Sequence, residues 1–224
     1  AQLAFKQKIV QNNLERIGGL SDFEMYPVIG METPYAYRNK AQFPVGEDKD
    51  GNIVIGFYAG RTHHIVEQTD CCIGAPENGE VLRKVRAYMQ KNQIRPYNEE
   101  HHSGIMRHIL IRTGYHTKEI MVCLIVNAAK ASCLKNAEQL TESLREMDGM
   151  TSVMVNFNTE KTNVILGKKS EVLWGQPYIE DFIGDVKYQI SPQSFFQVNP
   201  MQTEKLYAKA LEYAGLTGNE TVWD

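Results

Sequence analysis

Residues 190–200 read ISPQSFFQVNP and lead directly into an amphipathic helix. Further along, residues 220–224 read ETVWD, which predicts the first part of a buried strand. A strand that ends on an acidic residue normally precedes a glycine-rich turn that holds a nucleotide-like cofactor. No such turn follows in this sequence. We therefore expect the chain to be the front part of a larger enzyme, trimmed at both ends, because helical spacing is already under way at Ala1.

The helix that follows residue 199 has a well-specified start. Asn199 can cap it, Pro200 suits the first helical position, and Gln202 stands where it can bond back to the cap. This accounts for Asn199 structurally but not for Phe195 and Gln197. In an alternating strand these two side chains share one face, although one of them is polar. A surface glutamine beside a partly covered phenylalanine is the plain alternative.

The remaining patterns predict an α+β fold, in which antiparallel strands carry helices over one face. Residues 21–34 contain two prolines and a glycine and predict a linker. A helix over 132–147 is expected to have Ser132 as its cap. Expected strands cover residues 37–45, 53–58, 63–68, 106–114, 119–126, 151–156 and 188–190, and the other expected helices cover residues 1–17 and 77–93.

The composition is that of an ordinary soluble globular protein, with 224 residues, 42% hydrophobic and 23% charged. No apolar run approaches the length of a membrane span, and we expect no signal peptide. Four cysteines give no disulfide framework, which favours a reducing, cytoplasmic setting. A net charge of −3 argues neither for nor against RNA, because an overall balance can hide a basic face.

Five blocks of the sequence resemble, in the same order, segments of the RNA (uracil-5-)-methyltransferases, the RumA/TrmA-like family. The block SPQSFFQVN at 191–199 matches the pattern S-P-x-x-F-x-Q-V-N of that family. The blocks span nearly the whole chain, and five ordered agreements rarely arise by chance. The other four are YRNKAQF at 37–43, IGFY at 55–58, HIV at 64–66 with the cysteine at 71, and MRH at 106–108.

The resemblance implies a discontinuous domain organisation. Residues 35–190 would form a central α+β domain. Residues 1–30, an N-terminal helix and linker, and residues 191–224 would belong to the methyltransferase domain, of which the chain holds only the first elements of a doubly wound α/β sheet. The implied reaction transfers a methyl group from S-adenosylmethionine to C5 of uridine in RNA, after a thiolate has added at C6. Thiolate and base would both lie beyond Asp224, so we expect the fragment alone to be inactive.

The resemblance also assigns residues to ligands. The glutamine that matches Gln197 contacts S-adenosylmethionine, and the phenylalanine that matches Phe195 lies beside the target nucleotide. A side-chain amide offers a donor and an acceptor to the amino-acid end of the cofactor, and an aromatic ring suits an unstacked base. Arg38, Lys40 and Arg61 are expected to contact RNA phosphates. Without the family, their scatter along strands would indicate a solvated sheet surface.

Cys71 matches the fourth ligand of a [4Fe–4S] cluster that many family members carry. The three other ligands form a C-x5-C-x2-C run upstream of the segment that matches Ala1, and such clusters need about four thiolates. We therefore expect no cluster to be bound to this fragment. We also expect no bound S-adenosylmethionine, because the glycine-rich turn is missing. The histidine pairs at 63–64 and 101–102 do not predict a metal site, because neighbouring side chains on a strand point to opposite faces.

Ribosomal RNA, most specifically 23S ribosomal RNA, is favoured over transfer RNA as the partner, since a cluster ligand at Cys71 fits that branch of the family better. We expect no membrane partner and a monomeric parent. Three alternatives stay open: a transfer-RNA uracil-5-methyltransferase, a non-catalytic RNA-binding module, and a redox-sensing iron–sulfur protein. A glycine loop and an S-C-N-P motif beyond Asp224 would favour the enzyme.

Overall fold

The computed structural model describes residues 1–223 and divides into two compact units, Ala1–Pro34 and Tyr35–Asp224, with Asp224 itself outside the described residues. The domain boundaries implied by the resemblance stay a prediction, because these units group residues 191–223 with the central part of the chain. Among residues 1–223, no helix combines the length and the apolar character that a membrane span requires.

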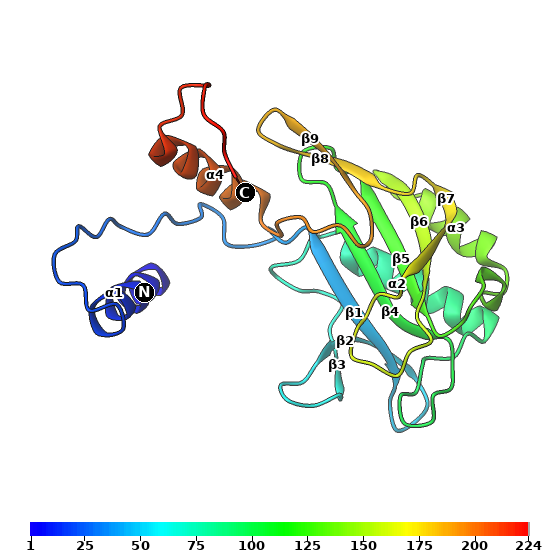
Figure 1. Ribbon diagram of the computed structural model, residues 1–224. Coiled ribbons are helices and arrows are strands. Elements are labelled where there is room, and N and C mark those ends of the chain that lie inside the picture. Colours follow the sequence, from blue (N-terminus) through cyan, green and yellow to red (C-terminus); the bar gives the residue numbers. More distant parts are fainter. Residues whose placement is uncertain (224) are drawn as a thin grey trace. The chain divides into compact units, whose positions relative to one another are not determined.

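The first unit is a single helix with an irregular tail (Figure 1). Helix α1 (Gln2–Arg16) begins and ends close to the predicted positions, and Gly19 follows it in the left-handed region with φ 66°. A glycine at such a position avoids the steric penalty of a Cβ atom. None of the residues of α1 is buried, and its apolar residues Leu3 and Val10 are exposed. Residues 21–34 form no helix or strand, as the linker prediction requires.

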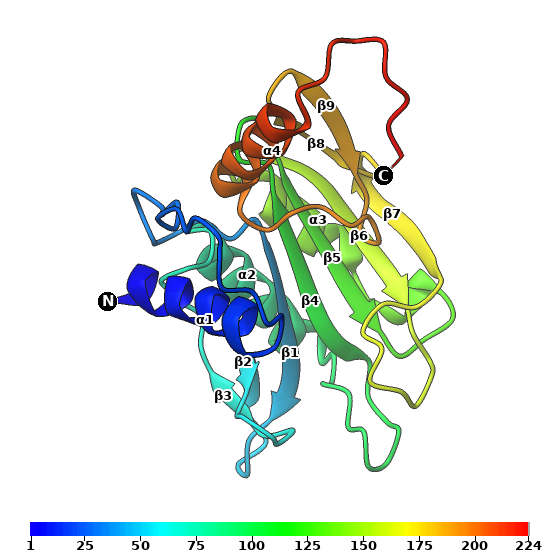
Figure 2. The same cartoon turned by 60° about the vertical axis from the view of Figure 1, so that its left-hand side comes forward.

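The second unit is built on a seven-stranded sheet in the order β3-β2-β1-β4-β5-β6-β7. Its predicted class, α+β with helices over one face, is confirmed, and Figures 1 and 2 show α2 and α3 on the same side of the sheet. The strands are β1 (Lys40–Glu47), β2 (Ile53–Tyr58), β3 (Ile65–Glu67), β4 (Met106–Thr113), β5 (Ile120–Val126), β6 (Met150–Phe157) and β7 (Lys169–Gly175). The helices are α2 (Asn78–Asn92), α3 (Ala137–Arg145) and α4 (Pro200–Ala214).

One pair of strands departs from the antiparallel prediction. Strands β5 and β6 are parallel, in a register that runs from Ile120 beside Met150 to Val126 beside Phe157. A parallel pair needs a crossover connection, and α3 provides it across the face of the sheet. The alternating pattern of a single strand does not reveal the direction of its neighbour, which is why the antiparallel prediction was wrong for this pair.

Both faces of the sheet are covered, by different kinds of structure. The larger core lies under α2 and α3, with Phe43, Ile109 and Val122 on the sheet side. On the opposite face, Leu110 and Cys123 pack with residues of the β8 (Ile179–Ile183) and β9 (Val186–Ile190) hairpin and with Phe196. Because successive residues of a strand point to opposite faces, both cores form from the same strands.

The structure corrects the predicted helix at 132–147 and adds two strands that were not predicted. The helix expected over 132–147 is split into a short 3₁₀ turn, Ala131–Cys133, and α3, so Ser132 is not the cap. Asn136 interrupts it because its backbone is left-handed, with φ 52°, and its side chain donates to Asn92 of α2 at 2.7 Å. The strands β7 and β8 were not predicted, since their charged residues weaken the alternating pattern.

The strand expected at 220–224 is also wrong over its described residues, 220–223. The Glu220 carboxylate accepts backbone N–H groups of Thr217 at 2.9 Å and Gly218 at 3.0 Å, which closes a turn. Val222 and Trp223 are 64% and 93% exposed, with no strand beside them in the described chain. Asp224 lies outside the described residues.

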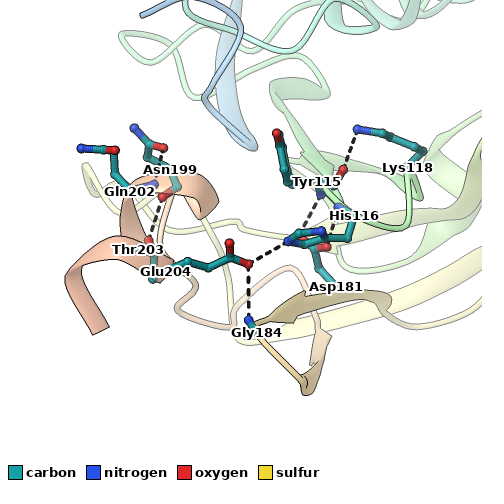
Figure 3. A network of polar contacts seen from close by, with 9 residues as sticks. All are labelled: Tyr115, His116, Lys118, Asp181, Gly184, Asn199, Gln202, Thr203 and Glu204. Carbon is teal, nitrogen blue, oxygen red and sulfur yellow. Dashed lines mark hydrogen bonds and ion pairs between the residues drawn. The ribbon is translucent and has the colours of Figure 1, made fainter. Parts of the chain in front are cut away.

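A buried carboxylate fastens the β8–β9 hairpin to the β4–β5 turn. Asp181 is fully buried and accepts the backbone N–H groups of Tyr115 at 2.8 Å and His116 at 2.9 Å (Figure 3). His116 in turn contacts Glu204 of α4 through Nε2 at 2.9 Å, and the same carboxylate oxygen accepts the Gly184 N–H at 3.3 Å. The hairpin, the turn and the first part of α4 are therefore joined by one polar network.

Replacing Asp181 tests how much this network contributes to stability. Asp181→Ala leaves two partly buried N–H groups without their acceptor, so we expect the free energy of unfolding to fall by about 2–4 kcal/mol. Asp181→Asn keeps one acceptor oxygen and should lose about half as much. Urea denaturation measures both, through the midpoint at an unchanged slope. Equal stability of wild type and Asp181→Ala would contradict the assignment.

Candidate nucleic-acid interface

Residues 191–199 cross one end of the sheet and are held there by a buried arginine. The guanidinium of Arg112, on β4, is 2% exposed and donates from Nη2 to the backbone carbonyls of Pro192, at 3.3 Å, and Ser194. Burial lowers the pKa of Arg112 to about 10, which still leaves it protonated at neutral pH. The segment was expected to be an alternating strand, but it is irregular because its carbonyls bond to this side chain rather than to another strand.

Asn39, immediately before β1, holds the same segment at its other end. Its side-chain Nδ2 donates to the carbonyl of Gln197 at 3.0 Å, and its backbone N–H donates to the carbonyl of Val198 at 3.1 Å. Beyond this point Asn199 caps α4 by accepting the Gln202 N–H at 3.2 Å, and Pro200 occupies the first turn, as predicted. The segment is thus fixed to the sheet on one side and continues into a capped helix on the other.

This anchoring sets the directions of the three central side chains. Phe196 is 8% exposed and packs in the second core, whereas Phe195 is 86% exposed. Gln197 is half-buried, and its side-chain amide forms no hydrogen bond with another described residue. An exposed aromatic ring and an unused amide therefore stand close together on a segment whose backbone is held in place. Their predicted ligands, the nucleotide for Phe195 and the cofactor for Gln197, stay predictions.

Three cations gather beside this segment. Lys40 lies opposite Arg112 in the β1–β4 register, and Arg38 is two residues earlier in the chain. Burial, then Arg112 and Arg38, lower the pKa of Lys40, which shows that the positive charges act on one another. Within residues 1–223, no carboxylate forms an ion pair with any of the three. Concentrated positive charge of this kind attracts an anion such as phosphate.

The structure does not bring Arg61 into this cluster. Arg61 was expected on a strand, but it lies exposed in the turn between β2 and β3, with a left-handed backbone at φ 63°. No hydrogen bond, ion pair or ring contact in the described chain joins it to Arg38 or Lys40. Its predicted phosphate contact would therefore belong to a different part of the surface.

The cysteines present do not form an iron–sulfur site by themselves. Cys71 is half-buried and Cys72 is exposed, while Cys123 is fully buried within β5, where burial raises its thiol pKa to about 12. The described residues contain no group of three or more metal-ligating side chains. A cluster needs about four thiolates, so Cys71 could serve only as one ligand of a larger set. The cysteine turn nevertheless borders the cation cluster, because Arg38 pairs with Gly74 in an isolated bridge.

The sequence did not predict that Asn39 and Arg112 hold the backbone of residues 191–199. The place of Arg112 in the apolar run of β4 could have marked it as buried. In that strand it shares a face with Leu110, which a purely solvated arginine would not do. Asn39 gave no local signal, since its partners are far along the chain.

Comparison with known proteins supports the sequence resemblance, although no protein-family model matches the chain. A protein of Clostridium tetani described as an uncharacterized RNA methyltransferase is 46% identical over 224 residues, which are 100% of this chain and 48% of that protein. An uncharacterized RNA methyltransferase of Halalkalibacterium halodurans is 47% identical over 225 residues, with the same coverage. The chain therefore spans about half the length of the curated relatives it matches.

A solved structure shows the same relationship in three dimensions. The Pyrococcus abyssi tRNA (uracil-54, C5)-methyltransferase, in complex with S-adenosyl-L-homocysteine, matches with a TM-score of 0.74 and 26% identity, over 94% of this chain and 47% of that chain. The resemblance to the RNA (uracil-5-)-methyltransferase family is confirmed. The family block at 191–199 is thus the segment that Arg112 and Asn39 hold against the sheet.

The anchoring by Arg112 can be tested through hydrogen exchange. Arg112→Met removes both donors, so the Asn39 N–H, which bonds to Val198, should exchange about tenfold to a hundredfold faster, as expected for the loss of a bond to a charged group. The buried Val122 amide, at the centre of the sheet, is the internal reference and should be unchanged.

Arg112→Lys is the matched control, because it keeps the charge but replaces the planar donor fork by a single ammonium group. It should give an intermediate exchange rate. Unaltered exchange at Asn39 in Arg112→Met would show that the segment is held by other contacts.

Proposed function

We propose that this chain is the RNA-facing part of an enzyme that transfers a methyl group from S-adenosylmethionine to C5 of uridine in RNA. The observation that carries the proposal is the exposed Phe195 beside the unpaired cations Arg38 and Lys40, on a backbone that the sheet holds fixed. An exposed ring offers a stacking surface to an unpaired base, and neighbouring cations offer contacts to its phosphates. A paired uridine would first have to leave its helix.

The roles of the chain's own side chains follow from this arrangement. Arg38 and Lys40 would bind the backbone of the RNA, and Phe195 would position the exposed base. Gln197, two residues further along, would hold the amino-acid end of S-adenosylmethionine through its unused amide. The cofactor supplies the methyl group. Cys123 cannot serve as the nucleophile that adds to C6, because it is buried with a raised pKa, and we propose that residues 1–224 alone do not catalyse.

The proposal also covers the class of RNA, the cellular setting and the role of Cys71. We favour 23S ribosomal RNA over transfer RNA and a cytoplasmic setting, with Cys71 as one ligand of an iron–sulfur cluster in a longer protein. The similar Pyrococcus abyssi enzyme is a tRNA (uracil-54, C5)-methyltransferase. This similarity supports transfer RNA as the alternative substrate. Mass mapping of 5-methyluridine in ribosomal and transfer RNA, from cells with and without the gene, decides between them. Unchanged 5-methyluridine in both RNA classes would contradict the proposed reaction.

Replacing Gln197 tests the cofactor contact. In the longer protein, Gln197→Ala should weaken cofactor affinity or turnover by about ten- to a hundredfold, as the loss of a hydrogen bond to a charged group predicts. The melting temperature should barely change, because the segment is held through the backbone carbonyl of Gln197 rather than its side chain. Calorimetry with S-adenosylmethionine and thermal denaturation measure the two effects. Normal affinity and turnover would make Gln197 a surface residue, and unfolding would make it structural.

Replacing the cations tests the RNA contact. Arg38→Ala together with Lys40→Ala should weaken binding of single-stranded RNA and lower the salt slope by about 0.7 for each lost phosphate contact. Filter binding over a range of salt concentrations measures both quantities.

Arg83→Ala with Lys91→Ala is the matched control, because these exposed residues lie on α2, over the opposite face of the sheet. It removes the same charge and should leave the slope unchanged. Identical slopes for the two double variants would show that Arg38 and Lys40 are merely solvated.

A further inference from the structure

A concave site lies on the same strands, away from the cation cluster. It is a cleft of about 790 Å³, lined by β1, the β2–β3 turn, the start of β4 and the loops at 97–100 and 162–165. His108 lies opposite Pro44 in the β1–β4 register, four residues along β4 from Arg112. Past the register shift between Met106 and His108, the side chains of His108, Leu110 and Arg112 share one face, so the cleft and the Arg112 site open on the same side of the sheet, about 13 Å apart along the strand.

His108 is the least explained polar group in this cleft. It is 9% exposed, and its Nδ1 atom is buried without a hydrogen-bond partner. Neither ring nitrogen bonds to another described residue, although a neutral imidazole carries one donor and one acceptor. Burial and the adjacent Arg107 lower the pKa of His108 to about 4, so the ring is neutral at physiological pH. The buried Nδ1 atom is out of reach of a ligand, whereas the unpaired Nε2 atom is not fully buried and can bond to a ligand in the cleft.

Aromatic rings form the wall next to His108. Tyr58 is 45% exposed, and its ring centroid lies 6.4 Å from that of His108 and 5.5 Å from that of His63. On the other side, Tyr97 supports Arg107, whose Cζ lies 4.4 Å from the centre of the ring. Arg107 is buried and donates to three backbone carbonyls, so it is occupied within the protein. A flat aromatic ligand could stack on Tyr58 without displacing any of these contacts.

The negative charge at the rim of the cleft excludes the phosphate group of a nucleotide. Four carboxylates line the cleft, those of Glu47, Asp48, Glu99 and Glu100. They would repel phosphate but would accept N–H donors. Glu99 is engaged with Nδ1 of His63 at 2.5 Å, and Glu47 lies 3.8 Å from Arg95, whereas Glu100 has no ion pair or hydrogen bond in the described chain.

We propose that the cleft binds an unstacked guanine base of the RNA. The inference rests on the proposed RNA function and adds a second base subsite to it. Tyr58 supplies the stacking surface, Nε2 of His108 donates to an acceptor of the base, and the Glu100 carboxylate accepts the N–H donors of the base. Guanine combines acceptors at O6 and N7 with the N2 amino group, next to a ring N–H, so it can satisfy both side chains. Uracil has a single ring N–H and cannot make the paired contact with a carboxylate.

Nuclear magnetic resonance of the isotopically labelled 224-residue chain tests the cleft directly. Titration with guanosine should shift the amide signals of Gly46 and Tyr58 and the ring signals of His108, and uridine should not. Tyr58→Ala and His108→Phe should each weaken guanosine binding by about fivefold or more, since each removes a stack or a hydrogen bond. Tyr213→Ala is the matched control, because this tyrosine is 74% exposed on α4 and lies outside the cleft.

Binding of short RNA connects the cleft to the proposed function. A uridine-only strand with one guanine should bind about fivefold to a hundredfold more tightly than the strand without it, the range expected for one stacked base. Tyr58→Ala should abolish this preference and keep binding of the uridine-only strand. Arg38→Ala with Lys40→Ala should have the opposite effect: it should weaken binding of both RNA strands and leave the signal shifts caused by guanosine unchanged.

The outcomes separate the two proposals. Absence of guanosine shifts, or equal shifts with uridine, overturns the guanine site whatever the RNA does. Shifts of the same signals by a lysine-rich peptide, without a response to guanosine, overturn it in favour of a protein partner. Guanosine binding without any affinity for the uridine-only strand supports the cleft and contradicts the proposed RNA interface around Arg38.

Discussion

The structure depends on the burial of one strand from both sides. Every residue of β5 is buried, and its side chains alternate between the two cores. An apolar strand of this kind is stable only if both faces of its sheet are covered. Helices cover one face, and on the other the β8–β9 hairpin and Phe196 do so. Because Phe196 completes that second core, its neighbour Phe195 has to point outward, so the exposed ring is a consequence of how the sheet is sealed.

Much of this fold could be predicted from local patterns. The limits of β2, β4 and β5 follow from apolar alternation and turn residues, and the cap at Asn199 follows from residue types alone. The parallel pairing of β5 with β6 could not be predicted, because it depends on which strands meet after a crossover. The split before α3 was missed because Asn136 bonds to Asn92, a contact distant in sequence.

The resemblance proposed residues for the candidate site, of which Arg61 lies in another part of the surface, and it did not reveal what holds the others in place. The family block identified Phe195 and Gln197, yet only the three-dimensional contacts show that Asn39 and Arg112 hold their backbone. Positive and negative side chains also lie at different ends of these strands. Unpaired cations gather near Phe195, and carboxylates line the cleft around His108. One end of this face is therefore suited to phosphates and the other to uncharged groups, a division that the net charge of −3 conceals.

The sheet is open, and its order leaves two strands with an unpaired edge, β3 and β7. Such edges invite pairing with another chain and hence aggregation. Here each edge strand has a feature that is known to prevent such pairing. Strand β3 has only three residues, and β7 begins with the Lys169–Glu171 ion pair and is distorted by a register shift against β6. The molecule can therefore keep its fully apolar central strand without offering a template along which sheets of separate copies would join.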